Sequence, residues 1–268
     1  MKNAYFDLAG EALVPAAHAH GPWAEDMLHG RLLGGLAARA IENSFGAPGW
    51  RVSRLTVDLF RPAPLKPVTI VTSPVRQGRR VKVVDALMTC DGHEVGRATA
   101  VMLVTGEHPP GNIWRPDQHM WPDPESISVP ETGSVADAEQ AGWLFRTVDG
   151  GFSTAQQSRV WTNDTVPLVH GEVMSPIVVA AVSGDIACPL ANSSDQGLHY
   201  INADYTMLLA RYPVGNWIGI EVAQQLHADG ISIASANLVD QHGPFATSSG
   251  SSLVRPPLQM DSPPPAQD

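Results

Sequence analysis

The chain has 268 residues, 43% of them hydrophobic, which is enough to bury a substantial core in one large domain or two smaller ones. No run of about 20 apolar residues could cross a bilayer, and MKNAYFDLAGEAL lacks the order of a signal peptide, so we expect a cytoplasmic protein. The net charge of -10 disfavours nucleic acid and anionic membranes as partners, so any anionic ligand must be bound by local arginines.

The first half of the sequence reads as one helix followed by a strand meander. Residues 29–45, HGRLLGGLAARAIENSF, place apolar side chains at helical spacing. Four alternating segments follow at 50–60, 68–75, 81–89 and 97–105, separated by turn-forming residues, and they predict antiparallel strands. The next residues are rich in Pro, Asp and Glu and predict a connection over 106–139.

The second half repeats this order. Ser175 and Pro176 form a typical start for a helix, and strand-like segments follow at 199–211, 216–225, 230–239 and 245–254. An ungapped shift of 150 residues aligns seven identical pairs: Thr56/Thr206, Leu59/Leu209, Arg61/Arg211, Ile70/Ile220, Ala86/Ala236, Leu103/Leu253 and Val104/Val254. We therefore predict an internal duplication, with units at 1–105 and 140–255, and a disordered Pro-rich tail at 256–268.

The repeated unit, an apolar helix followed by an antiparallel sheet, resembles the hotdog fold, in which the sheet wraps a central helix. Two units in one chain predict an α+β double hotdog. The sequence also resembles the acyl-CoA thioesterase II family through GPW (21–23), HGRLLGGLAARAIE (29–42), LTVDLFRPAPL (55–65), HYINADYTM (199–207), RYPVGNW (211–217) and GPF with SLVRP (243–256). This resemblance implies hydrolysis of an acyl-CoA to the free acid and CoA without a cofactor, and assembly into a homodimer or larger homo-oligomer.

One acid interrupts the apolar second helix. Asp185 lies in VVAAVSGDIACPL (178–190), and leaving a carboxylate unpaired in a core costs several kcal/mol, so it must be hydrogen-bonded, protonated or open to a cavity. An acid that caps a neighbouring loop would also fit. Matching Ser175 with His29 puts Arg39 in the equivalent position of the first half, so the acid is present in one half only.

The resemblance implies a catalytic set made of an Asp on the central helix, a polar residue on the next strand and a Gln on the last strand. By position these are Asp185 as the base, Asn202 as the group that orients the water, and Gly250 in place of the Gln. Gly250 departs from the pattern, so we expect slow turnover, with solvent, Ser249, Ser251, Gln224 or Gln225 filling the gap. Without the resemblance, Asn202 also fits a strand-end turn residue and Gly250 a bulge.

Further residues are candidates for binding. Arg211 and Arg255 could meet CoA phosphates or lie on a solvated surface, and His29 opens the first helix, whose N-terminus could bind an anion or polarise a carbonyl. Asp204 fits a structural acid or a group that tunes Asp185. The HAH at 18–20 has no acid or cysteine cluster beside it, so no metal site is predicted.

Two rival functions remain open. A non-catalytic acyl-CoA or acyl-carrier binding protein is favoured by the missing Gln at Gly250. A double-hotdog dehydratase or hydratase needs a His that works with the helix Asp, and the HGRLLGG start of the first helix lacks the Gly and Pro spacing of such enzymes.

Overall fold

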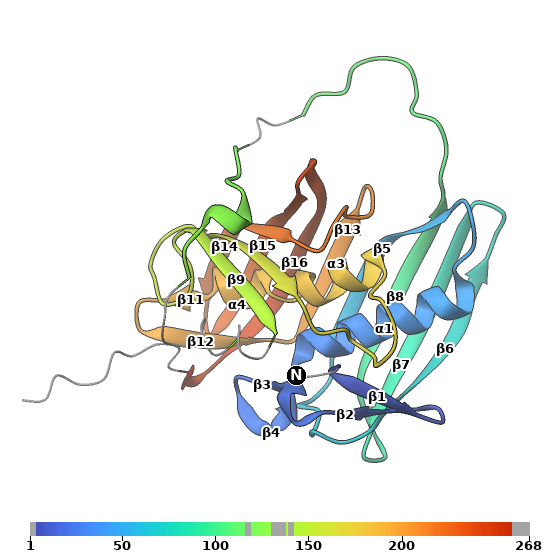
Figure 1. The fold of residues 1–268 in the computed structure, drawn as a ribbon, viewed down its shortest axis with the longest axis horizontal. Helices are drawn as coiled ribbons and strands as arrows, with labels where there is room; N and C mark the ends of the chain where they lie inside the picture. Colours follow the sequence, from blue (N-terminus) through green and yellow to red (C-terminus); the bar gives the residue numbers. More distant parts are fainter. Residues whose placement is uncertain (1–3, 116–118, 130–137, 139–141, 259–268) are drawn as a thin grey trace, which may run out of the picture.

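The computed structural model of the chain describes residues 4–115, 119–129, 138 and 142–258. Within these residues, fourteen strands form one sheet whose main path runs β1-β2-β6-β7-β8-β5-β13-β16-β15-β14-β10-β9 (Figure 1). β11 and β12 lie off this path, and β12 pairs with β16. No helix of the described residues is both long and apolar enough to cross a membrane.

The strands of the first half are β1 (Phe6–Ala9), β2 (Ala12–Pro15), β5 (Trp50–Leu59), β6 (Val68–Gln77), β7 (Val81–Cys90) and β8 (His93–Val104). A separate hairpin is formed by β3 (His20–Gly21) and β4 (Ala24–Leu28). Those of the second half are β9 (Trp143–Asp149), β10 (Arg159–Asp164), β11 (Ser193–Ser194), β12 (Gly197–Asn202), β13 (Asp204–Leu209), β14 (Ile218–Ala228), β15 (Ile231–Asp240) and β16 (Gly243–Leu258).

The predicted double hotdog is confirmed by the arrangement of helices and sheet. Helix α1 (Gly30–Phe45) packs on β5 to β8, and helices α3 (Pro176–Gly184) and α4 (Ala187–Ala191) pack on strands of the second half. Figure 1 shows α1 and α3 next to each other in the hollow of the curved sheet. An added Cβ on Gly35 would overlap Val182, so this glycine permits the close approach of the two helices. Two short helices are also seen among the described residues, η1 (Ala17–Ala19) and η2 (Pro124–Ser126).

The shift of 150 residues seen in the sequence recurs in the strands. β7 and β15 have equivalent bounds under this shift, and both β7–β8 and β15–β16 contain an irregularity at the equivalent places Met88/Thr89 and Leu238/Val239. The halves join where β5 pairs with β13, and there Thr56 lies directly opposite its counterpart Thr206, with 3.0 Å between the hydroxyl oxygens. An approximate twofold axis therefore passes through this pair.

The structure differs from the sequence prediction in four places. Strands β1 to β4 and β9 to β11 were not predicted, because they are short and show little alternation of apolar and polar residues. The segment predicted as one strand at 199–211 is divided at Ala203 into β12 and β13. The second helix is not continuous, because α3 ends at Gly184 and α4 begins at Ala187, with Asp185 and Ile186 between them. β16 continues to Leu258, three residues into the segment predicted as a tail, while 259–268 lie outside the described residues. The unit boundaries at 105, 139 and 255 stay predictions.

Candidate active site

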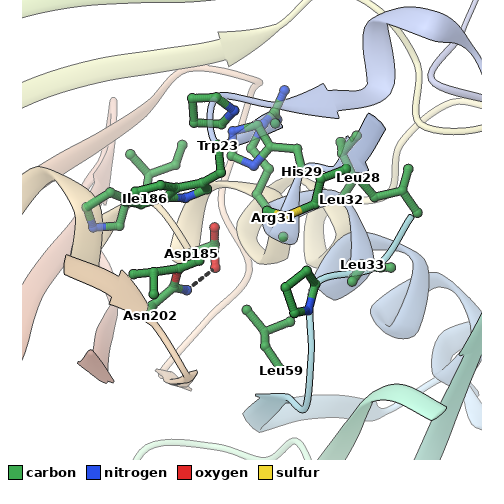
Figure 2. A pocket seen from close by; sticks show the side chains of 18 of the residues that line it. Trp23, Leu28, His29, Arg31, Leu32, Leu33, Leu59, Asp185, Ile186 and Asn202 are labelled. Atoms are coloured by element: carbon green, nitrogen blue, oxygen red, sulfur yellow. Dashed lines mark hydrogen bonds between the residues drawn. The ribbon is translucent and has the colours of Figure 1, made fainter. Parts of the chain in front are cut away.

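A cavity of about 770 Å³ lies between the two halves of the molecule. Its walls come from the β3–β4 hairpin, the first turn of α1, the junction between α3 and α4, β9, β12 and the end of β16. Most of the lining is apolar, and Asp185 and Asn202 bring polar groups into it (Figure 2). An apolar cavity with a few convergent polar groups is a typical ligand site.

Asp185 lies where the second helix is interrupted. It is the C-terminal cap of α3. It lies in a tight turn between α3 and α4, in which the Ile186 N–H donates to the Ser183 carbonyl at 3.2 Å. The residue is 3% exposed, and its Oδ1 accepts a hydrogen bond from Asn202 Nδ2 at 2.7 Å. Burial raises the pKa of Asp185 to about 6, against the opposing effects of this hydrogen bond and of the Arg31 charge.

Asn202 is the last residue of β12, and its position is set by the neighbouring strand. It lies opposite Ser252 of β16, and the following Ala203 separates β12 from β13. The Ala203 carbonyl accepts a hydrogen bond from the Leu59 N–H at 2.8 Å, which ties this break to the first half. Figure 2 shows the Asn202 amide directed at the Asp185 carboxylate, with Trp23 and His29 above them in this view.

The N-terminus of α1 faces Asp185 from the first half. A Cβ added to Gly30 would lie 3.9 Å from both carboxylate oxygens, so the backbone of the first helical turn is close to the acid. The first N–H groups of a helix have no partner within the helix and carry partial positive charge. His29 is the N-cap, and burial, with the Arg31 and His20 charges as smaller causes, lowers its pKa well below the usual value. The imidazole is therefore neutral.

Arg31 is a buried cation that the sequence analysis missed. It is 2% exposed, donates to Asp164 Oδ2 at 2.8 Å and to the Tyr5 hydroxyl at 2.9 Å, and lines the cavity. Asp164 neutralises its charge, so the pair is compatible with burial. The signal available in the sequence was the same as for Asp185, a charged residue inside an apolar helix.

Two arginines lie at the mouth of the cavity. Arg255 of β16 is exposed and its guanidinium lies 5.4 Å from the ring centre of Trp23, in the turn of the β3–β4 hairpin. Arg61, which was not among the site residues predicted from the sequence, is also exposed and lines the cavity. The two come from different halves of the chain.

Three predicted site residues do not line the cavity. Arg211 donates to Asp240 Oδ1 at 2.7 Å and to the Gly243 carbonyl at 2.9 Å, so its guanidinium is used in a structural ion pair instead of at a phosphate site. Gln225 donates to Asn192 Oδ1 at 3.2 Å, in a polar cluster at the C-terminal end of α4. Gly250 is the third.

The place of a side chain at Gly250 is already filled. A Cβ there would overlap the Asp204 carbonyl oxygen and lie 2.6 Å from Cys188 Sγ. Cys188 is a buried free thiol on α4, and burial raises its pKa above the usual range. Asp204 accepts hydrogen bonds from the N–H and the hydroxyl of Ser251, which is a structural use of this acid. Ser249, Ser251 and Gln224 do not line the cavity either.

The first half has no equivalent polar site. Arg39, which matches Asp185, donates through Nε to Glu172 Oε2 at 2.6 Å, and the Ser175 hydroxyl donates to Glu42. His29 and Ser175 are the N-caps of α1 and α3, and Ser175 donates to a glutamate, Glu42, of the other helix. No group of three or more His, Cys, Asp or Glu side chains suited to a metal occurs in the described part of the chain.

Two family models match the chain: an acyl-CoA thioesterase N-terminal domain over residues 19–103 and an acyl-CoA thioesterase C-terminal domain over 115–254. No match to a curated protein was found. A hotdog-fold protein of unknown function from Alicyclobacillus acidocaldarius has 19% identity and a TM-score of 0.73, with coverage of 95% of this chain and 97% of that one.

Two TesB proteins are also similar in structure. The tesB protein of Mycobacterium avium subsp. paratuberculosis has 17% identity and a TM-score of 0.66, covering 93% of this chain and 95% of that one. The acyl-CoA thioesterase II TesB2 of Mycobacterium marinum has 16% identity and a TM-score of 0.62, covering 85% and 90%. At this identity the likeness concerns the fold. The family models span most of the chain, so it belongs to the acyl-CoA thioesterase family.

Proposed function

We propose that the chain hydrolyses an acyl-CoA thioester to the free acid and CoA, with Asp185 as the general base. The observation that carries this proposal is the buried Asp185 carboxylate, held by Asn202 at the wall of an apolar cavity and facing the N-terminus of α1. A carboxylate with a pKa near 6 is ionised at neutral pH and is a stronger base than an exposed one.

The reaction needs a water molecule, a base and an oxyanion donor. Asn202 donates to Oδ1 of Asp185, so Oδ2 is left to accept a proton from water as its oxygen attacks the thioester carbon. The N–H groups of the first turn of α1, at Gly30, supply donors for the carbonyl oxygen as it becomes negative. The C–S bond then breaks, and the proton held by Asp185 passes to the CoA thiolate.

The mouth of the cavity offers positive charge for the rest of the substrate. Arg61 and Arg255 are exposed there, and guanidinium groups bind phosphates in bidentate geometry. We assign the CoA phosphates to this mouth. The sequence suggested Arg211 as a ligand of the CoA phosphates. We assign this role to Arg61, its counterpart in the first half, instead.

The test is Asp185→Asn, assayed by release of free CoA thiol from a panel of acyl-CoA esters. We expect turnover to fall by roughly 10²- to 10⁴-fold, because Asn cannot accept the proton. Wild-type turnover should also fall about tenfold per pH unit below about pH 6, as Asp185 becomes protonated. The matched control is Asp91→Asn, an exposed acid in the β7–β8 turn, which should leave turnover unchanged.

Non-catalytic binding of acyl-CoA is a second candidate, supported by the filled space at Gly250. Calorimetric titration of the same esters separates the two functions. Binding without thiol release by the wild type would favour a binding protein, whereas turnover within a few-fold of wild type in Asp185→Asn would exclude this acid as the base.

A further inference from the structure

Aromatic side chains form one continuous wall of the cavity. His29 and Trp143 have ring centres 5.4 Å apart at 85°, Trp143 and Phe145 are 4.4 Å apart at 66°, and Phe145 and Phe152 are 5.8 Å apart at 71°. We call these four residues the aromatic wall, and all of them line the cavity. It begins at the His29 N-cap of α1, next to Gly30 and therefore beside the Asp185 carboxylate (Figure 2).

Trp143 of the aromatic wall is held in place by a cation–π contact and a hydrogen bond. The Arg31 guanidinium lies 4.0 Å from the Trp143 ring centre and is itself fixed by Asp164. Trp143 Nε1 donates to Thr162 Oγ1 at 2.7 Å, so the indole has both a stacked partner and a hydrogen bond. Since Arg31 covers one face of the indole, only its other face and its edges can meet a ligand. These contacts fix the ring before a ligand binds.

Such a wall distinguishes acyl groups by shape and stiffness. Near-perpendicular rings at these distances are the preferred arrangement of aromatic pairs, and a further ring could continue the series. A linear alkyl chain would bury similar area but would lose the freedom of several rotatable bonds against a rigid surface. A flat ring has few such bonds to lose.

On the basis of the proposed function, we infer that the acyl group preferred by this cavity carries an aromatic ring close to the thioester, bound against the aromatic wall. Trp143 and Phe152 are then residues that determine specificity and take no part in the chemical step. The preference arises from ring stacking, so a saturated ring of the same size should gain less from the wall than a phenyl ring.

The experiment compares three CoA esters with equal numbers of acyl carbons: phenylacetyl-CoA, cyclohexylacetyl-CoA and octanoyl-CoA. We expect kcat/KM for phenylacetyl-CoA to exceed that for octanoyl-CoA by roughly three- to tenfold, with cyclohexylacetyl-CoA between them. Equal or higher kcat/KM for octanoyl-CoA would overturn the inference while leaving thioester hydrolysis intact.

Two substitutions locate the preference. Trp143→Leu and Phe152→Leu should each bring the phenylacetyl-to-octanoyl ratio toward one without removing turnover of octanoyl-CoA. Trp217→Leu is the matched control, because Trp217 lies outside the cavity lining, and its ratio should stay at the wild-type value. Thermal melting of each variant separates a lost preference from a lost fold, and an unchanged ratio in both wall variants would exclude the wall.

If none of the three esters is hydrolysed, the proposed function fails, and calorimetric titration then tests the aromatic wall directly. Tighter binding of phenylacetyl-CoA than of octanoyl-CoA, abolished in Trp143→Leu, would support the wall as an aromatic site. Equal binding of the two esters would overturn it.

Discussion

The pKa of Asp185, about 6 in the folded chain against 3.8 for an ordinary Asp, links the proposed reaction to the free energy of unfolding. Between these two values the folded chain binds more protons than the unfolded chain, so stability falls as the pH rises from about 4 to about 6. Above that window, the buried ionised carboxylate lowers the free energy of unfolding by about 3 kcal/mol.

We therefore expect Asp185→Asn to be more stable than the wild type at pH 7.5, by up to about 3 kcal/mol, and by much less at pH 4. The Asn side chain can still accept the hydrogen bond from Asn202 through its amide oxygen. Denaturant unfolding at both pH values measures the difference. If Asp185→Asn lowered the free energy of unfolding equally at both pH values, the Asp185 carboxylate would stabilise the fold instead of destabilising it.

At this scale the sequence revealed part of the candidate site. Asp185 stood out because an acid in an apolar helix demands an explanation, and the acyl-CoA thioesterase resemblance pointed to Asn202. Arg31 carried the same kind of signal. Its partners Tyr5 and Asp164 lie far away in sequence, so no local pattern could show that the charge is paired. The ion pair of Arg211 with Asp240 was hidden for the same reason.

At the scale of elements, Gly250 shows how β16 and α4 constrain each other. Its φ is not in the positive region, so a strand-compatible backbone alone would have admitted a Gln. The obstacle is space, because a Cβ would meet the Asp204 carbonyl oxygen of the adjacent strand and the Cys188 thiol. Solvent and nearby polar residues were expected to fill this gap, whereas the Cys188 thiol lies there.

We expect Gly250→Ala to lower the free energy of unfolding by about 1–3 kcal/mol, because backbone and helix must move apart. Gly250→Gln should be at least as destabilised and should gain no turnover. Gly106→Ala is the control, since a Cβ there meets no atom within 4 Å and its φ is not positive. A stable Gly250→Gln with raised turnover would show that the strand adapts and that the missing amide had slowed the reaction.

Strands joined by short turns of typical sequence were the elements that could be predicted. The hairpins at Asp91-Gly92 and Asp229-Gly230 have positive φ at both residues, and Asp-Gly pairs flanked by alternating segments are strong hairpin signals. β9 and β10 are joined by a longer loop over 150–158 instead of a two-residue turn, and they lie at the end of the sheet, where β10 pairs with both β9 and β14. The break at Asp185 does have a signal in the sequence, because Pro189 has no N–H to donate to the carbonyl four residues earlier, which is that of Asp185.

At the scale of the whole molecule, the difference between the two halves predicts how many acyl-CoA molecules one chain binds. The equivalent of the Asp185 site in the first half contains the Arg39–Glu172 ion pair, with Glu42 bonded to Ser175. Titration of the catalytically impaired Asp185→Asn with an acyl-CoA should therefore saturate at one ligand per chain. Arg39→Ala should leave this number unchanged, because it supplies no acid or amide in that place. Saturation at two per chain would mean that both helix N-termini bind substrate.

The junction at Thr56 and Thr206 bears on how such asymmetry can persist. Because each threonine lies opposite its own counterpart, this strand pairing could equally join two copies of the first half or two copies of the second. Separate halves would then sort into like and unlike pairs, and only unlike pairs would bring the α1 start of one half against Asp185 of the other. A single polypeptide keeps the unlike half at high effective concentration, so every molecule has one complete site. Each half is thereby free to accumulate changes that would inactivate a symmetric dimer.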